Sequence, residues 1–99
     1  MPYIKQEDRT KWERIINEVV GELEKLDLKD VEGNLNYFIT SILKKTYQPK
    51  YFNYNRAMGL LECIKQEFYR RQIAVYEDEK IKENGDVEWK ANLKHIIKK

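Results

Sequence analysis

Residues 12–26 read WERIINEVVGELEKL, and apolar side chains recur in this stretch at every third or fourth position. The recurring residues are Trp12, Ile16, Val19, Leu23 and Leu26. Side chains three and four positions apart are neighbours on the surface of an α-helix, so this spacing gathers them on one side of a helix. The stretch therefore predicts an amphipathic helix whose apolar stripe packs against another part of the protein.

Two later stretches repeat the same pattern. The second stripe consists of Val31, Leu35, Phe38 and Ile42, and the third consists of Ala57, Leu61, Ile64 and Phe68. Pro49 lies between them and ends the second helix, because proline cannot continue the ladder of backbone hydrogen bonds. Three amphipathic helices with short connections predict an all-α fold, a small antiparallel bundle of three main helices that enclose one shared core.

The ends of the helices can also be predicted from capping residues. We expect Asp8 or Thr10 to cap the first helix, which ends near Asp27, since short polar side chains accept hydrogen bonds from the first free amides. The second helix is expected to start between residues 30 and 34. Residues 50–55 are aromatic and polar and are expected to form a connector, one of whose asparagines caps the third helix.

The third stripe is interrupted by Arg71, which stands where an apolar residue is due, and the pattern resumes at Val75. We expect this helix either to continue to about Lys82 or to break once near Val75. In both cases Asn84-Gly85 ends it, because glycine readily adopts the positive φ that closes many helices.

The length and charge of the chain limit its fold and its partners. A chain of 99 residues forms a single small domain, which we place at residues 1–87, followed by a basic amphipathic tail or short helix at residues 88–99. Lysine and arginine number 19 against 17 acidic residues, so the overall charge does not by itself indicate nucleic acid. Because small domains gain stability by association, we expect a homo-oligomer, most simply a homodimer.

Several function classes are disfavoured by what the sequence lacks. No apolar run approaches the roughly 20 residues of a membrane span, and residues 1–8 carry no signal-peptide core, so we expect a cytoplasmic protein without a membrane partner. The single cysteine, Cys63, is expected to be a small buried hydrophobe. One cysteine and one histidine cannot build a His/Cys zinc site within the chain. No motif indicates a cofactor, and an enzymatic activity is not favoured.

Aromatic, basic and acidic side chains follow one another closely in residues 69–87, YRRQIAVYEDEKIKENGDV. We expect a binding surface here, because tyrosine and arginine are enriched among the residues that dominate interface energies. Its predicted members are Arg70, Arg71, Tyr76, Glu77, Asp78 and Lys80. Glu67 and Arg71 stand four positions apart with the acid first, which favours an ion pair. That pair either is structural or holds the guanidinium ready for an anionic ligand.

The preferred function is a non-enzymatic module that binds another macromolecule, a protein partner of unknown identity. The first alternative is a nucleic-acid-binding accessory protein, since aromatic and basic residues can stack on single strands, although the acids at 77–79 would repel a phosphate backbone. The second is a magnesium-dependent hydrolase, because the spacing of two acids on the first helix resembles all-α nucleotide pyrophosphatases of the MazG type. Its candidate metal-binding residues are Glu18, Glu22, Glu62 and Glu67. The paired acidic motifs of that family are not present at the required spacing.

Four segments of the chain form a distinctive pattern. They are Asn34-Leu35-Asn36-Tyr37, Glu67-Phe68-Tyr69-Arg70-Arg71, Tyr76-Glu77-Asp78-Glu79-Lys80-Ile81 and Glu83-Asn84-Gly85-Asp86-Val87. This pattern resembles a family of short uncharacterised prokaryotic and phage proteins over residues 2–87. The resemblance implies a domain boundary near residue 87 and no particular activity.

Overall fold

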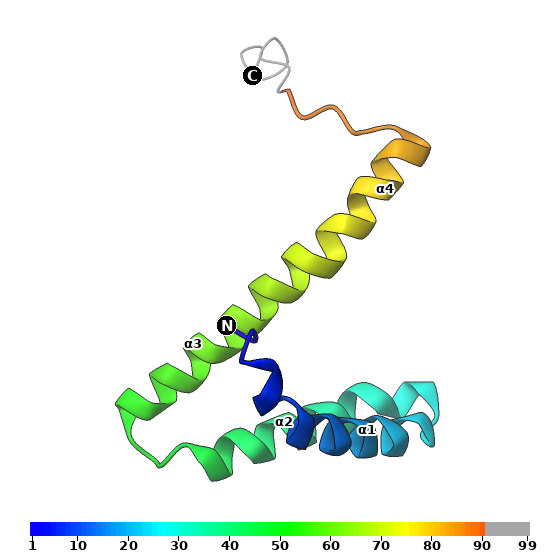
Figure 1. Ribbon diagram of the computed structural model, residues 1–99. Coiled ribbons are helices and arrows are strands. Elements are labelled where there is room, and N and C mark those ends of the chain that lie inside the picture. Colours follow the sequence, from blue (N-terminus) through cyan, green and yellow to red (C-terminus); the bar gives the residue numbers. More distant parts are fainter. Residues whose placement is uncertain (91–99) are drawn as a thin grey trace. The chain divides into compact units, whose positions relative to one another are not determined.

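The computed structural model describes residues 1–90, and all regular secondary structure in that range is helical. The elements in chain order are η1 (Gln6–Asp8), α1 (Thr10–Glu24), η2 (Leu28–Asp30), α2 (Val31–Thr46), α3 (Tyr51–Phe68), η3 (Tyr69–Ile73) and α4 (Ala74–Asn84) (Figure 1). The elements η1 and η2 are single 3-10 turns, and η3 is a short π-helix. The predicted all-α fold class is therefore confirmed. The backbone divides into two compact units, Met1–Lys65 and Gln66–Lys99.

The first helix starts where expected and ends early. α1 begins at Thr10, close to the expected position, but its capping position is Arg9 and no side chain caps it, so the predicted cap by Asp8 or Thr10 is wrong. It ends at Glu24, whereas the sequence predicted an end near Asp27. The amides of Lys25 and Leu26 bond to carbonyls only three residues back, at 3.3 and 3.1 Å. Such short-range bonds tighten the last turn and close the helix.

The second helix returns along the first. α2 begins at Val31, inside the predicted range, and runs alongside α1 in the opposite direction (Figure 1). Its end at Thr46, shortly before Pro49, also confirms the prediction. Half-buried aliphatic side chains gather where the two helices join, and we call this group the α1–α2 seam: Val19 and Leu23 of α1, Leu26 between the helices, and Val31 and Leu35 of α2. The two predicted stripes therefore meet where α1 ends and α2 begins.

Other members of each apolar stripe are open to solvent. Ile16 is 54% exposed on α1 and Ile42 is 47% exposed on α2. Ile64 on α3 is 53% exposed. No side chain in residues 1–90 is fully buried, so this part of a single chain does not form one shared core around three stripes. The antiparallel three-helix bundle thus stays a prediction.

Cys63 is exposed, and its expected role as a buried hydrophobe is wrong. It comes directly before Ile64, which belongs to the apolar stripe of α3. Successive residues of an α-helix are about 100° apart around its axis, so Cys63 lies to the side of the stripe. Its thiol therefore faces solvent in the single chain.

The third helix starts earlier than expected. α3 begins at Tyr51, inside the stretch that was expected to form a connector. Asn53 lies within the first turn, where its side-chain amide donates to the Gln48 carbonyl at 3.2 Å. An asparagine that was expected to cap the helix therefore stabilises it from inside. The predicted connector is wrong because Pro49 by itself ends α2, and the next helix starts as soon as the backbone leaves the proline.

The third helical segment is continuous to Asn84, as the first of the two predicted alternatives requires, and it passes from α3 through the π-helical η3 into α4. At the end of η3 the amide of Ala74 donates to the carbonyl of Tyr69, five residues back. A π-helical turn holds more residues than an α-helical one, and this turn falls where Arg71 interrupts the apolar stripe. α4 ends at Asn84, and Gly85 has a φ of 85°, which confirms the predicted stop.

The chain after α4 has no helical structure as far as residue 90. The rest of the basic tail predicted for residues 88–99 lies outside the described residues. Of the helices in residues 1–90, none combines the length and the apolar content that are needed to cross a lipid bilayer.

Candidate functional site

The predicted binding residues lie on two consecutive elements. Arg70 and Arg71 belong to the π-helical segment η3. The other four, Tyr76, Glu77, Asp78 and Lys80, belong to α4. All six side chains are exposed. Short π-helical segments are rare and occur frequently at functional sites, which makes this end of the described chain the natural place to look for one.

The two arginines have different surroundings. Arg70 Nη2 lies 2.6 Å from Glu67 Oε1 and forms an ion pair with it. Glu67 was expected to pair with Arg71, but positions three and four apart are both neighbours on a helix, and here Arg70 takes the carboxylate. The Arg70 side chain is 65% exposed, so water screens the pair and it stabilises the fold by at most about 1 kcal/mol. Arg71 makes no ion pair within residues 1–90.

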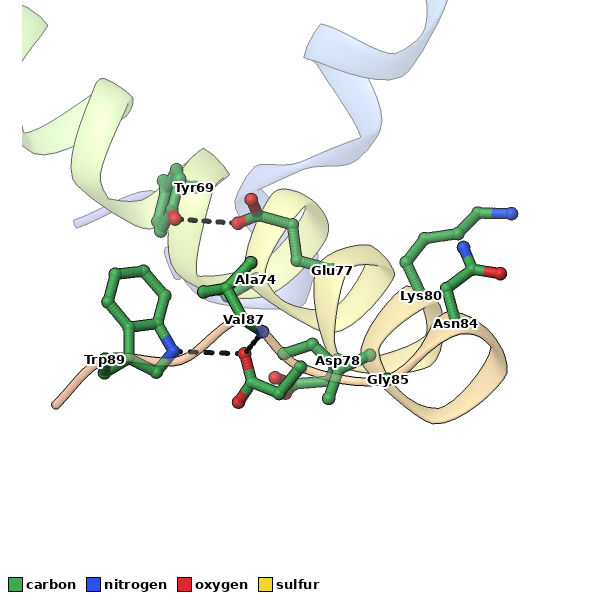
Figure 2. Close-up of a pocket in the computed structure, with 11 residues that line it drawn as sticks. Tyr69, Ala74, Glu77, Asp78, Lys80, Asn84, Gly85, Val87 and Trp89 are labelled. Atoms are coloured by element: carbon green, nitrogen blue, oxygen red, sulfur yellow. Dashed lines mark hydrogen bonds between the residues drawn. The ribbon is translucent and has the colours of Figure 1, made fainter.

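A hollow of about 530 Å³ opens beside α4. Three members of the predicted surface line it, namely Glu77, Asp78 and Lys80, whereas Tyr76 and the two arginines do not. The other lining residues are Tyr69, Ala74, Ile81, Asn84, Gly85, Asp86, Val87 and Trp89 (Figure 2). The structure thus gathers half of the predicted surface in one concave place and adds residues from beyond the helix.

The reversal of the chain at Gly85 builds this hollow. The φ of 85° and ψ of 153° at Gly85 are a combination that other residues adopt only with strain. The chain then returns along α4, as Figure 2 shows, so that Trp89 and Tyr69 line the same hollow. Ala74 and Ile81 stand seven positions apart, on one face of α4, and form the apolar lining together with the Trp89 ring.

A hydrogen bond joins η3 to α4 at one side of the hollow. The Tyr69 hydroxyl donates to Glu77 Oε1 at 2.7 Å (Figure 2). This bond and the negative charge of Glu77 raise the pKa of Tyr69, because an ionised phenol could not donate and would be repelled by the carboxylate. Asp78 adds a smaller repulsion in the same direction. Tyr69 therefore keeps its proton at neutral pH, and the Glu77 carboxylate is held in place.

Asp86 organises the chain on the other side of the hollow. Its Oδ1 accepts hydrogen bonds from the Val87 amide at 2.7 Å and from the Trp89 indole Nε1 at 3.0 Å (Figure 2). The indole N–H is thus satisfied, while Trp89 remains 81% exposed. The ring is positioned by its edge, and most of its surface is available for contact with another molecule.

The hollow carries an excess of negative charge. Among the described residues, the charged groups that line it are the carboxylates of Glu77, Asp78 and Asp86 and the ammonium of Lys80. The Lys80 ammonium lies 3.0 Å from Glu83 Oε2 and 5.5 Å from the centre of the Tyr76 ring, so its charge is already engaged. Asp78 accepts no hydrogen bond from any residue in the range 1–90. This charge favours a cation in the hollow and disfavours an anion.

Asp86 and Trp89 were not among the predicted site residues. The signal that points to them is local: glycine predicts a reversal of the chain, and an aspartate just after it can accept hydrogen bonds from nearby donors. The sequence placed Trp89 in the basic amphipathic tail or short helix of residues 88–99 and not in the binding surface. The site therefore depends on the turn at Gly85, and the sequence did not predict which side chains this turn brings to the hollow.

Most of the carboxylates of the hydrolase alternative pair with a cation three positions further along the chain. Three of the four pair with a cation: Glu22 with Lys25 at 3.1 Å, Glu62 with Lys65 at 3.9 Å and Glu67 with Arg70 at 2.6 Å. The fourth, Glu18, lies one turn before Glu22 on α1. Within the described part of the chain, no three His, Cys, Asp or Glu side chains are grouped so that they could hold a metal ion. The structure therefore does not gather the predicted metal-binding residues.

Comparison with known proteins yields a family and no activity. The sequence model of a family described as a domain of unknown function matches residues 1–87. No curated protein and no solved structure matches the chain. The matched range ends where the sequence placed the domain boundary, and Trp89, which lines the hollow, lies just beyond it.

Proposed function

The chain belongs to the DUF6899 family, a domain of unknown function. For this member of the family we propose a non-enzymatic module that binds another macromolecule and works as a homo-oligomer. One observation carries the proposal: large apolar side chains on α1 and α2 are not covered by residues 1–90 of a single chain. Exposed apolar faces of this kind on a small protein are typical of interaction surfaces.

The exposed side chains of α1 and α2 support a second copy as their cover. They include Trp12, Ile15, Ile16, Val20, Phe38, Ile39 and Ile42. Complete burial of one large apolar side chain stabilises an assembly by about 1.5–3 kcal/mol, so a few of them are enough to favour association. The heptad-like spacing on α1 is also the pattern by which helices of identical chains pack on one another.

In the proposed assembly the α1–α2 pairs of two copies pack together into one bundle, which differs from the predicted bundle of three main helices because α3 is not part of it. The exposed faces of α1 and α2 become its core. The described residues that line the hollow all lie in the range 69–89 and do not belong to these faces, so in this proposal the hollow stays available to a partner. Self-association therefore serves stability, and the surface on η3 and α4 serves recognition.

Ile42→Glu tests the homo-oligomer, because a carboxylate in an apolar interface loses its hydration without a compensating partner. We expect size-exclusion chromatography with light scattering to give a mass above that of one chain for the wild-type protein. The variant should give the mass of a single chain and keep its helical circular dichroism. Lys44→Glu, also on α2 but outside the apolar stripe, is the matched control and should leave the mass unchanged. A wild-type protein that is monomeric at every concentration would overturn the homo-oligomer.

The hydrolase and nucleic-acid alternatives stay predictions, as do the cytoplasmic location and the prokaryotic or phage origin. A thermal-shift screen with nucleotides and magnesium tests the hydrolase, which predicts a stabilisation that Glu18→Gln removes. The nucleic-acid alternative predicts salt-sensitive binding of a single-stranded oligonucleotide that Arg71→Ala weakens. No contact within residues 1–90 favours either of them over the binding module.

A further inference from the structure

We propose that the hollow beside α4 is the docking site for a peptide segment of a partner protein that carries lysine or arginine side chains between apolar ones. The inference rests on the proposed function, since it assumes a macromolecular partner and adds that partner's chemistry. It follows from the lining of the hollow, which combines an acidic rim with an apolar and aromatic wall.

The rim has capacity for a cation that the described chain does not use. Asp78 lines the hollow and accepts no hydrogen bond from residues 1–90. Within the same range, hydrogen bonds reach one oxygen of Glu77 and one oxygen of Asp86, while a carboxylate can accept at both. An incoming ammonium or guanidinium group can therefore bind at the rim without displacing an existing contact.

The wall suits the rest of a basic side chain and its apolar neighbours. Trp89 has its N–H bonded to Asp86 and its ring largely exposed, and tryptophan is the aromatic residue that attracts cations most strongly. Ala74 and Ile81 can contact the aliphatic stem of a lysine or arginine, which is apolar up to its charged end. A volume of about 530 Å³ lies within the usual range of ligand sites and is enough for one or two side chains.

Other occupants fit the lining less well. A phosphate backbone or another anion would meet three carboxylates, and the two arginines that could attract it do not line the hollow. A metal ion would need a convergent group of ligands, and no such group exists among residues 1–90. An organic cation attached to an apolar chain satisfies both the rim and the wall.

The first experiment titrates the full-length protein against two labelled probes by fluorescence anisotropy. One probe is a fluorescein-labelled peptide of lysine and leucine, and the other has glutamate in place of every lysine. We expect the lysine peptide to bind, and to bind more weakly as salt is added, because exposed charges are screened beyond about 10 Å at 0.1 M ionic strength. A glutamate peptide that binds as tightly would overturn the docking site.

Three variants locate the binding. Asp78→Asn removes a charge from the rim and should weaken the lysine peptide about fivefold. Trp89→Leu keeps an apolar side chain without the aromatic face and should weaken it about threefold. Glu79→Gln is the matched control, because it removes the same charge one position along α4 and outside the lining. An equal loss with Glu79→Gln would reveal general attraction to the acidic helix and would overturn the site.

Light scattering on the same samples separates the two proposals. If the protein is monomeric and still binds the lysine peptide at the hollow, the homo-oligomer fails and the docking site holds. If the protein is oligomeric and binds no lysine peptide, the docking site fails and the homo-oligomer holds. A single-stranded oligonucleotide that displaces the peptide from the hollow would assign the site to nucleic acid and overturn the peptide partner.

Discussion

The α1–α2 pair and the segment from Tyr69 to Trp89 are held together by different interactions. In the pair, half-buried aliphatic side chains meet along a seam. In residues 69–89, Ala74 is the one residue that is half-buried. The side-chain hydrogen bonds there include one from Tyr69 to Glu77, eight positions apart, and one from Trp89 to Asp86, three positions apart. One region therefore depends on apolar contact and the other on directed polar contact.

This difference indicates a division of tasks. Apolar contact is not directional and grows with area, so the pair is suited to stabilise the fold and to associate with more apolar surface. An exposed hydrogen bond adds only about 1 kcal/mol, but it fixes the position of the groups that it joins. The C-terminal segment is thus suited to present a defined arrangement of charges and rings to a partner.

The largest effect should come from the seam. Leu23→Ala removes a half-buried side chain between α1 and α2 and should lower the free energy of unfolding by about 1–3 kcal/mol, because its apolar contacts are lost without replacement. Chemical denaturation followed by circular dichroism measures this change. Glu24→Ala, at the exposed next position, is the control and should change it by less than about 0.5 kcal/mol. An equal decrease in the free energy of unfolding in both variants would show that the seam is not the main source of stability.

An intermediate effect is expected at the chain reversal. Gly85→Ala forces a side chain into a backbone conformation that costs about 1–3 kcal/mol, which should open the turn. The amide of residue 85 donates to the Ile81 carbonyl at 2.8 Å, so its hydrogen exchange should become about tenfold faster. Unchanged exchange would mean that the turn does not depend on glycine.

Gly59→Ala is the contrasting glycine variant. It lies inside α3, where an added methyl group meets nothing within 4 Å. The substitution should stabilise the protein by about 0.5–1 kcal/mol in thermal denaturation, because alanine favours the helix over the unfolded chain. Destabilisation would place Gly59 against another helix in the assembly, as a close helix crossing would require.

The smallest effect concerns the phenol of Tyr69. Its pKa is raised in the folded chain, so the folded protein holds this proton at a pH where the unfolded chain has released it. The stabilisation is present below about pH 10 and is lost as the pH rises through the folded pKa. Glu77→Gln should return the pKa towards its ordinary value, measured by NMR titration of the ring assigned with Tyr69→Phe. Glu79→Gln should lower the pKa of Tyr69 less. An equal decrease in both variants would mean that the hydrogen bond to Glu77 does not raise this pKa.

The sequence predicted most of what depends on neighbouring residues. α2 begins at Val31 and ends at Thr46, and α4 ends at Asn84, as expected, because apolar spacing, proline and glycine act locally. The structure departs from the prediction where a backbone hydrogen bond does not join residues four apart. The bonds that close α1 join residues three apart, and the bond in η3 joins residues five apart. The predicted burial was also wrong in part, since Cys63 and six of the thirteen stripe residues are exposed in the described part of a single chain.

The candidate site was predicted in part for the same reason. Glu77, Asp78 and Lys80 could be found from the composition of α4, because they stand close together along one helix. Asp86 and Trp89 could not, because their place beside the helix depends on the direction in which the chain leaves Gly85. A turn residue indicates that a chain reverses but not which side chains then meet.

The amino-acid sequence alone determined that this protein is helical and where its apolar and charged side chains gather along each helix, since both follow from the period of the helix. Only the tertiary structure decided which stripes meet at the α1–α2 seam and that Tyr69 and Trp89 line one hollow. Those results require positions far apart in the chain to come together. Which distant residues come into contact depends on the backbone angles of the turns and on which apolar surfaces pack together. A local sequence pattern does not specify either.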